Sequence, residues 1–272
     1  MQIPCVVSIA GTDPSGGAGI QADIKAISAT GSYAASVITA LVAQNTQGVQ
    51  AIHAVPISFV RKQLDAVFND LNIKAVKIGM LHHAGIIEVV AHTLTKFRTK
   101  YVVLDPVMIA KDGSLLLDTA TIGVLKAQLL HQVSLITPNL FEAKQLLNIE
   151  ISTFPDMEKA ARQLGQEFNI NVLLKGGHVN VGTTASDVLY SIQDDLCHWL
   201  HVTRINTNNT HGTGCSLSAA IASFLAQGLT LYAAVKRAKE YLTNAIKFGS
   251  KQNIGRGHGP VDHFYFLRQS AK

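Results

Sequence analysis

Charged residues are scarce in this chain of 272 residues. Asp, Glu, Lys and Arg together make up 15% of it, whereas about 25% is usual for globular domains. Hydrophobic residues make up 47%. An intrinsically disordered chain needs the opposite balance, with low hydrophobicity and high charge. The composition therefore excludes a disordered protein and indicates a globular domain with a large core.

Cysteine is also rare. The three cysteines, Cys5, Cys197 and Cys215, form no CxxC pair. An odd number of widely spaced thiols is typical of a reducing compartment, so we expect a cytoplasmic protein without disulfides. The 11 histidines are dispersed and form no cluster with the spacing of zinc ligands. We therefore assign no direct protein ligand for a metal from the sequence.

Long apolar runs and basic clusters of the nucleic-acid type are missing as well. No apolar run approaches the 18 or so residues of a membrane span. The N-terminal MQIPCVVSIAGTD has no basic region, so we expect a first strand there and not a signal peptide. The net charge is +5, but the Lys and Arg residues are scattered. We expect neither a membrane nor a nucleic acid as partner, and a mild positive charge suits an enzyme that binds phosphates.

Apolar segments and helical periods alternate along almost the whole chain. Continuous apolar runs rich in β-branched residues predict buried strands at 6–10, 35–43, 75–79, 101–106, 133–138 and 171–177. Helical spacing of apolar residues recurs at 20–27, 60–71, 86–94 and 217–225. This order predicts an α/β fold, with a mostly parallel sheet and helices on both of its faces. Looser alternation at 186–192 and 198–205 predicts an antiparallel hairpin at the sheet edge, and no linker divides residues 1–272, so we expect one domain.

The loops that follow the predicted strands carry most of the Gly, Asn, Asp, Lys and His residues. In a parallel sheet these loops gather beyond the carboxyl ends of the strands, which is where ligands bind. The segment HGTGCSLSAAIASF at 211–224 is the strongest of them. Gly212, Thr213 and Gly214 precede a helix, whose N–H groups and dipole favour an anion. Cys215 in the first turn is expected to have a lowered pKa. The alternative is a glycine loop feeding a buried helix, with Cys215 as a small core residue.

A second glycine-rich segment, GTDPSGGAG at 11–19, follows the first predicted strand. It matches neither the Walker loop nor the dinucleotide fingerprint. Its glycines could let the backbone fold over a small ligand or form a lid, and an ordinary strand-to-helix turn is an equal alternative. Asp23 follows four residues after Gly19. It could point into the same cleft, although an isolated Asp on a helix usually faces solvent.

Four further polar residues, in three segments, lie at a helix start or at strand ends. Asn139 and Glu142 have the spacing of a helix capping box, and they could also order water around a metal-bound triphosphate. Asp105 ends a buried strand, where a carboxylate needs a cation or a ligand as partner. Lys175 ends another strand beside two glycines, which suits a phosphate oxygen.

Seven segments, in this order along the chain, resemble the hydroxymethylpyrimidine/phosphomethylpyrimidine kinases of thiamine biosynthesis, a branch of the ribokinase-like superfamily. They are SIAGTDPSGGAGIQADIKAISATGSYAASVITALVAQNTQGV, VKIGM, VVLDPVM, ITPNLFEA, LLKGGH, THGTGCSLSAAIA and GHGPVDHF. The resemblance implies a three-layer ribokinase-like fold and a homodimer. It also implies ATP and Mg²⁺ as cofactors, and phosphoryl transfer first to the pyrimidine alcohol and then to its monophosphate.

The resemblance also assigns roles to residues. It implies that Gln44 holds the pyrimidine edge, and that Gly11, Asp23, Met80 and Val107 line the same pocket. The anion hole would consist of Gly212, Thr213, Gly214 and Cys215, with Lys175 near the phosphates and with Asp105, Asn139 and Glu142 linked to ATP and Mg²⁺. Sugar kinases of the superfamily have an Asp where this chain has Cys215. Whether Cys215 takes the hydroxyl proton or only completes the anion hole stays open.

Two other functions are compatible with the sequence. Pyridoxal kinases act on a similar hydroxymethylated ring, so relative turnover on the two substrates would separate the alternatives. A non-catalytic, ligand-binding regulator could also use this fold, because a fold does not determine a function. The joint presence of Asp105, Glu142, Lys175 and the GTGC segment argues against loss of activity.

Overall fold

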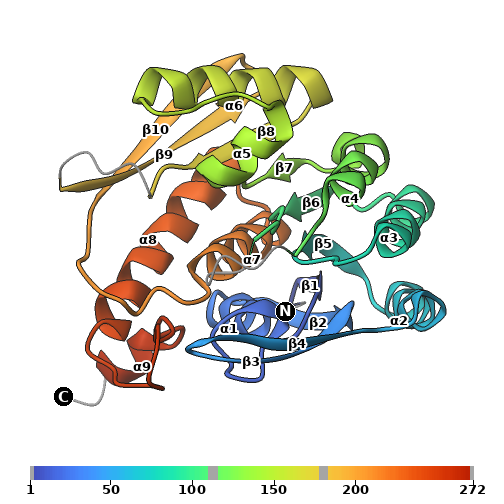
Figure 1. The fold of residues 1–272 in the computed structure, drawn as a ribbon, viewed down its shortest axis with the longest axis horizontal. Coiled ribbons are helices and arrows are strands. Elements are labelled where there is room, and N and C mark those ends of the chain that lie inside the picture. Colours follow the sequence, from blue (N-terminus) through green and yellow to red (C-terminus); the bar gives the residue numbers. More distant parts are fainter. Residues whose placement is uncertain (1–2, 110–115, 178–182, 270–272) are drawn as a thin grey trace.

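The computed structural model describes residues 3–109, 116–177 and 183–269. An eight-stranded sheet forms its centre (Figure 1). In spatial order the strands are β10 (Leu196–Thr203), β9 (Thr184–Ser191), β8 (Asn171–Lys175), β7 (Leu135–Ile136), β6 (Tyr101–Leu104), β5 (Ile73–Ile78), β1 (Cys5–Ala10) and β2 (Tyr33–Ile38). The six strands from β8 to β2 are parallel to one another. Strand β9 is antiparallel to both of its neighbours, β8 and β10. The predicted mostly parallel sheet and the edge hairpin are therefore confirmed.

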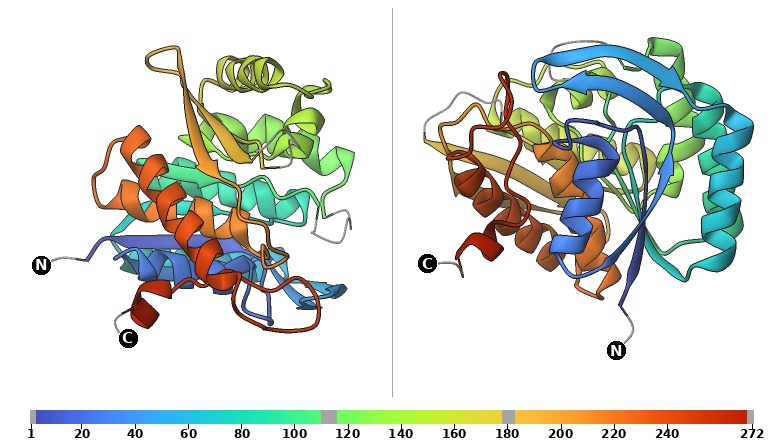
Figure 2. Two further views of the ribbon diagram at one scale, coloured as in Figure 1. Left: turned by 90° about the vertical axis from the view of Figure 1, so that its left-hand side faces the viewer. Right: turned by 90° about the horizontal axis from the view of Figure 1, so that it is seen from below.

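Helices cover both faces of the sheet (Figures 1 and 2). One face packs against α1 (Gly19–Ala29), α7 (Thr213–Ala226) and α8 (Leu231–Gly249). The other packs against α2 (Ile57–Asp70), α3 (Ala84–Phe97), α4 (Thr119–Val124), α5 (Leu140–Leu147) and α6 (Phe154–Phe168). A π-helical turn at Leu125–Leu129 and a 3₁₀ turn at Leu130–Gln132 follow α4, and α9 (Tyr265–Gln269) follows the other helices along the chain. The result is the predicted three-layer arrangement.

The strands are apolar on both faces because each face meets a helical layer. In β1, Val7 and Ile9 belong to the core beneath α2 and α3, whereas Val6 belongs to the core beneath α1 and α7. The same alternation runs through β5, where Val76 and Ala75 lie in different cores. Side chains of a strand point alternately to opposite faces. A strand covered on both sides therefore needs a continuous apolar run, which is the pattern that predicted it.

The segment 35–43, predicted as one buried strand, is two strands. β2 ends at Ile38, and β3 (Ala40–Asn45) pairs with β4 (Gly48–Ala54) in a separate antiparallel sheet (Figure 1). The break lies at the buried Thr39, whose Oγ1 donates to the carbonyl of Met80 at 2.7 Å and whose N–H donates to the carbonyl of Ala10. In β3, Val42 is buried while Leu41 is exposed. The alternation of one buried and one exposed face marks a strand that has left the central layer.

Within the part of the chain that the structure describes, no helix is long and apolar enough to cross a membrane.

Candidate active site

A cavity of about 1170 Å³ opens beyond the carboxyl ends of the parallel strands. Its position is the one expected for ligand sites in such sheets. Twelve of the thirteen residues singled out from the sequence line it: Gly11, Gln44, Met80, Asp105, Val107, Asn139, Glu142, Lys175, Gly212, Thr213, Gly214 and Cys215. The fold therefore brings together groups that lie up to about 200 residues apart in sequence.

The start of α7 forms one wall of the cavity. Gly212 is the residue before the helix and has a φ of 78°, in the left-handed region that glycine adopts without strain. A Cβ atom at this position would lie 1.7 Å from the carbonyl oxygen of Gly17, so no other residue fits. The first turn of a helix presents N–H groups that have no partner within the helix. Together with the helix dipole they make this wall suited to an anion.

An ion pair crosses the sheet directly behind this helix start. Asp105 follows β6, Lys175 ends β8, and the Lys175 Nζ lies 2.7 Å from the Asp105 Oδ1. A Cβ atom on Gly214 would lie 3.2 Å from the Asp105 Oδ2 and 3.4 Å from the Lys175 Nζ. Burial by itself lowers the pKa of Lys175, but Asp105 and Glu142 raise it overall, so Lys175 keeps its charge. Its ammonium group is thus fixed at the cavity wall.

Asn139 and Glu142 form the predicted capping box at the start of α5. The backbone N–H of Glu142 donates to the Asn139 Oδ1 at 2.9 Å, and the backbone N–H of Asn139 donates to a Glu142 carboxylate oxygen at 2.8 Å. Glu142 is buried at the cavity wall. Burial raises the pKa of Glu142 to about 7, with Lys175 acting in the opposite direction. The capping role is thus real, and a hydrogen bond from the Met108 backbone N–H adds to the stabilisation of the Glu142 carboxylate.

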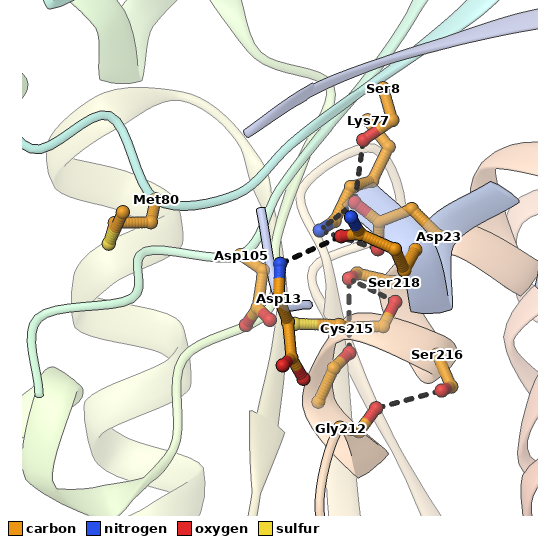
Figure 3. A network of polar contacts seen from close by, with 12 residues as sticks. Ser8, Asp13, Asp23, Lys77, Met80, Asp105, Gly212, Cys215, Ser216 and Ser218 are labelled. Carbon is orange, nitrogen blue, oxygen red and sulfur yellow. Dashed lines mark hydrogen bonds and ion pairs between the residues drawn. The ribbon is translucent and has the colours of Figure 1, made fainter. Parts of the chain in front are cut away.

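The expectation that Cys215 has a lowered pKa is wrong. Burial raises the pKa of the Cys215 thiol to about 11, and Asp23 and Asp105 add to the rise. Lys77 and a hydrogen bond from the backbone N–H of Gly19 act in the opposite direction without reversing it. A helix start and a nearby cation both lower a thiol pKa, but burial raises it, and burial is the largest contribution here. Cys215 therefore rests as a neutral thiol within a group of charged side chains (Figure 3).

Asp23 does not line the cavity, which corrects the position expected for it. The side chains of Asp23 and Lys77 are both fully buried, and the Lys77 Nζ contacts the two carboxylate oxygens of Asp23 at 2.7 and 2.8 Å (Figure 3). The hydroxyl of Ser8 also donates to Asp23, at 2.5 Å. Burial lowers the pKa of Lys77, but Asp23, Cys215 and Asp105 together more than offset this and the net change is upward. Lys77 lines the cavity wall, where Asp23 was expected.

Asp13 organises the glycine-rich loop between β1 and α1. Its carboxylate accepts hydrogen bonds from the backbone N–H groups of Ser15, Gly17 and Ala18 at 2.7 to 3.1 Å. The Nε2 of His211 lies 2.7 Å from the same carboxylate. Burial by itself raises the pKa of Asp13, but the hydrogen bonds from His211, Ser15 and Ala18 lower it to about 2. The loop is therefore fastened to His211, the residue that precedes the Gly212–Cys215 segment.

The opposite wall carries the residues expected to hold the substrate ring. Gln44 lies in β3, not in a loop, next to a register shift between Ala43 and Gln44 in the pairing with β4. Such bulges change the direction in which a side chain points. Gly11 packs closely against Met80, since a Cβ atom there would lie 2.4 Å from the Met80 Cε and would displace the end of that side chain. Val107 completes this half of the cavity.

A sequence model of the phosphomethylpyrimidine kinase family matches residues 13–262. The chain is 49% identical over 258 residues to the thiamine biosynthesis bifunctional protein ThiED of Geobacter sulfurreducens, a match that covers 95% of the chain and 52% of that protein. It is 46% identical over 260 residues to the hydroxymethylpyrimidine/phosphomethylpyrimidine kinase of Escherichia coli, covering 95% and 97% of the two chains. The chain belongs to the phosphomethylpyrimidine kinase family. It spans about half the length of the Geobacter relative.

The fold of this phosphomethylpyrimidine kinase family member also matches solved structures. An ADP complex of Bacillus subtilis pyridoxal kinase superposes with a TM-score of 0.90 at 35% identity, covering 98% of this chain and 99% of that one. The resemblance inferred from the sequence and the ribokinase-like fold that it implied are therefore confirmed.

Sequence reasoning missed two parts of this family member's site. Lys77 gave a signal, because it lies in the run 75–78, which is buried and otherwise apolar, and a buried lysine needs an acidic partner. The other part is an apolar wall formed by Val202, Ile205, Leu242 and Ile246, beside an ion pair between Lys239 and Asp187. These residues come from β10, the segment after it and α8, and nothing in their local pattern points to a cavity.

Proposed function

We propose that this protein transfers the γ-phosphoryl group of ATP to the hydroxymethyl oxygen of 4-amino-5-hydroxymethyl-2-methylpyrimidine, and then a second phosphoryl group to the resulting monophosphate. The observation that carries the proposal is the convergence of three elements in one cavity. These are the helix start at Gly212–Cys215, the Asp105–Lys175 pair and the amide of Gln44. The family relationship and the relatives' names support the same activity.

The chain's own residues supply what phosphoryl transfer needs. The reaction requires alignment of the two oxygens and stabilisation of charge on the phosphoryl group, and little covalent help. The N–H groups at the start of α7 and the ammonium group of Lys175 lie on one side of the cavity, fixed before substrate binds. The side-chain amide of Gln44 can donate and accept at once, which suits a ring nitrogen beside an amino group. Gln44 would orient the ring so that its hydroxymethyl group faces the start of α7.

The residues present fit a magnesium nucleotide. Asp105 and Glu142 place two carboxylates at the cavity wall near Lys175. Mg²⁺ is usually held by one or two carboxylates together with phosphate oxygens and water. Among the described residues no group of three His, Cys, Asp or Glu side chains could hold a metal by itself. We propose that Asp105 and Glu142 hold Mg²⁺ together with the phosphates, and that the ion neutralises charge on the β- and γ-phosphate oxygens when bound.

A pyridoxal kinase is the second candidate, and the match to the Bacillus subtilis pyridoxal kinase fold favours it specifically. A coupled assay with Mg²⁺-ATP and three acceptors decides: the pyrimidine alcohol, its monophosphate and pyridoxal. We expect a kcat/KM on the alcohol and on the monophosphate at least tenfold above that on pyridoxal. A higher kcat/KM on pyridoxal would replace the proposal. Absence of turnover on all three, with nucleotide binding intact, would instead indicate a ligand-binding regulator.

We further propose that residues 1–272 act as one kinase domain in a cytoplasmic homodimer. Both helical layers pack along the same sheet, and all three cysteines are free thiols. Leu41 on β3 and Phe59 near the start of α2 are large apolar side chains that are about half exposed, at 49% and 56%. The dimer is the arrangement that the sequence resemblance implies. Sedimentation equilibrium of the protein and of a Leu41→Asp variant would test it.

A further inference from the structure

The buried hydroxyl of Ser216 lies between the start of α7 and a segment near the C-terminus. Its Oγ is 2.8 Å from the carbonyl oxygen of Gly212 and 2.8 Å from the Nε2 of His263. Ser216 is fully buried and His263 is almost fully buried. Neither residue lines the cavity, so the contact is behind the helix start and not in the substrate site.

The hydrogen-bond directions in this contact follow from the chemistry of the groups. The carbonyl oxygen of Gly212 can only accept, so the single hydroxyl hydrogen of Ser216 is directed to it. The Ser216 oxygen is then the acceptor for His263, which must carry its hydrogen on Nε2. Burial and the charge of Lys25 lower the pKa of His263 to about 4, with Asp262 acting in the opposite direction, so the ring is neutral at pH 7. The resulting relay runs from His263 Nε2–H through Ser216 to the Gly212 carbonyl.

The far end of the relay is held firmly by α8. The hydroxyl of Tyr241 donates to the carbonyl oxygen of His263 at 3.0 Å, and the backbone N–H of Asp262 donates to the carbonyl of Ala245 at 2.9 Å. The same segment also reaches the other side of the anion-binding loop, because the backbone N–H of His211 donates to the carbonyl of Gly259 at 3.0 Å. The segment from 259 to 263 therefore contacts the chain on both sides of Gly212 and Gly214, at His211 and at Ser216.

The start of α7 needs such support. Its N-cap is Gly212, and no side chain caps the helix there. Most helices satisfy this end with Ser, Thr, Asp or Asn at the N-cap. Glycine supplies the left-handed φ but has no side chain to cap with. The peptide after Gly212 is held by backbone groups, because its carbonyl accepts from the Ser216 N–H at 2.9 Å and its N–H donates to the Thr210 carbonyl at 3.4 Å. The Ser216 hydroxyl adds a second donor to the Gly212 carbonyl, and its contact with His263 ties the first turn of α7 to the segment from 259 to 263.

We propose that His263 and Ser216 are positioning residues that hold the first turn of α7 in place beside the transferring phosphoryl group. The inference rests on the proposed kinase function, and it assigns a role to two residues that do not touch substrate. A displacement of about 1 Å at a reacting group can reduce a rate about a hundredfold. Loss of the relay should therefore reduce turnover while leaving the binding of the pyrimidine ring nearly unchanged.

The test uses four variants of the full chain: His263→Phe, His263→Gln, Ser216→Ala and the double variant His263→Phe/Ser216→Ala. Gln retains an N–H donor near the position of Nε2, whereas Phe fills the space without one. We expect kcat on the pyrimidine alcohol to fall about tenfold or more in His263→Phe and Ser216→Ala, with KM for the alcohol within threefold. His263→Gln should recover at least a third of the wild-type kcat. The double variant should lose no more than the worse single variant, because both remove one relay.

Arg268→Met is the matched control. It removes the ion pair of Arg268 with Asp262 in the same segment and leaves the relay intact. We expect its kcat to stay within twofold of wild type. A loss in His263→Phe that Gln does not recover, or multiplying losses in the double variant, would overturn the proposal in favour of a packing role. If His263→Phe does not fold, His263→Gln and Ser216→Ala decide in the same way.

A measurement independent of activity separates failure of the relay from failure of the proposed function. Long-range ¹H–¹⁵N spectra of the free protein at pH 7 should show His263 as the neutral Nε2–H tautomer. Ser216→Ala should shift its ring nitrogens and the amide signals of Thr213 and Gly214. An Nδ1–H tautomer or unchanged amides would overturn the relay even if the wild-type enzyme turns over. Absence of wild-type turnover with the expected spectra would instead reject the kinase function.

Discussion

An ion pair between Lys175 and Asp105 joins the carboxyl ends of β8 and β6, across the short strand β7 that lies between them. The Lys175 Nζ lies 2.7 Å from the Asp105 Oδ1, and β7 separates β8 from β6 in the sheet. The pair packs against the first turn of α7 at Gly214. A cation, a carboxylate and a helix start are thus held in fixed relation before any ligand binds. Such preorganisation avoids rearrangement during the reaction, which is how charged groups contribute most to catalysis.

Replacement of Lys175 by Met should reduce kcat about a hundredfold or more. The change removes the positive charge at similar length and leaves Asp105 without its partner. If the contact strengthens in the transition state, kcat should fall more than nucleotide affinity. Steady-state kinetics and calorimetric titration with ADP measure the two effects. Lys96→Met, which breaks an exposed pair with Asp65, is the control and should change neither. Wild-type kcat in Lys175→Met would make Lys175 a structural residue.

Gly214→Ala should impair turnover through a single added methyl group. Its Cβ would press on the Asp105–Lys175 pair at 3.2 and 3.4 Å. Either the pair or the helix start must then move, so we expect kcat to fall about tenfold. Gly123→Ala in α4 is the matched control, because a Cβ atom there meets nothing within 4 Å. This control should keep full activity and gain about 0.5–1 kcal/mol in the free energy of unfolding. Equal kcat in the two variants would show that the pair does not need its present position.

Gln44→Ala should weaken binding of the pyrimidine while the fold stays intact. Loss of an amide that both donates and accepts costs about 1–3 kcal/mol when its partners lose their hydrogen bonds. We therefore expect KM for the alcohol to rise about tenfold or more, and calorimetric titration should give a matching loss of affinity. Gln50→Ala, at an exposed position of β4 away from the cavity, should behave as wild type. Unchanged affinity in Gln44→Ala would exclude Gln44 from ring recognition.

Asp13→Asn should lower the free energy of unfolding at neutral pH. It should also make that free energy less dependent on pH in the acid range. The folded pKa of Asp13, about 2, lies below its ordinary value of 3.8. The carboxylate therefore stabilises the fold fully above the ordinary pKa, and this contribution is lost as the pH falls from about 4 to 2. We expect a loss of about 1–2 kcal/mol at pH 7. Urea unfolding at pH 7, 4 and 2.5 measures it, with the exposed Asp70→Asn as control. A free energy of unfolding unchanged at pH 7 would contradict the role given to Asp13.

Local pattern predicted the features that depend on neighbours in sequence. The capping box of Asn139 and Glu142 and the edge hairpin are set within a few residues, and both are present. The partner of Asp23 is Lys77, 54 residues away, and only the packing of α1 against the sheet brings them together. The division of the segment 35–43 into two strands at Thr39 could not be predicted from the sequence for a similar reason. Its neighbours form an unbroken apolar run, and the bond to the Met80 carbonyl that marks the turn is a tertiary contact.

The pKa of Cys215 shows a second limit of sequence reasoning. A helix start predicts a lowered thiol pKa, because the rule concerns the local dipole. Burial acts against ionisation and depends on everything that packs around the sulfur. Here burial is the largest contribution and reverses the sign.

That reversal separates the two roles open to Cys215. A thiol with a pKa of about 11 is almost entirely protonated at pH 7 and therefore cannot accept the proton of the substrate hydroxyl. We therefore expect the free enzyme to use Cys215 as a neutral part of the anion-binding wall. Cys215→Ser should then keep kcat within about tenfold of wild type, because a hydroxyl also fits this wall as a neutral donor. A base role predicts a loss of about a hundredfold or more in Cys215→Ser, since a hydroxyl is a far poorer base than a thiolate.

Alkylation of Cys215 gives the resting pKa directly. Mass spectrometry of the Cys215 peptide after timed treatment with iodoacetamide follows this thiol apart from Cys5 and Cys197. The rate should rise about tenfold per pH unit from 7 to 10, without a plateau, because only the thiolate reacts. Prior addition of the pyrimidine alcohol should block it, since Cys215 lies at the cavity wall. A plateau near pH 7 would mean that the cations at Lys77 and Lys175 outweigh burial, and Cys215 would then be ionised and able to act as the base. Full activity of Cys215→Ala on both the alcohol and the monophosphate would contradict either role and leave Cys215 as a packed thiol.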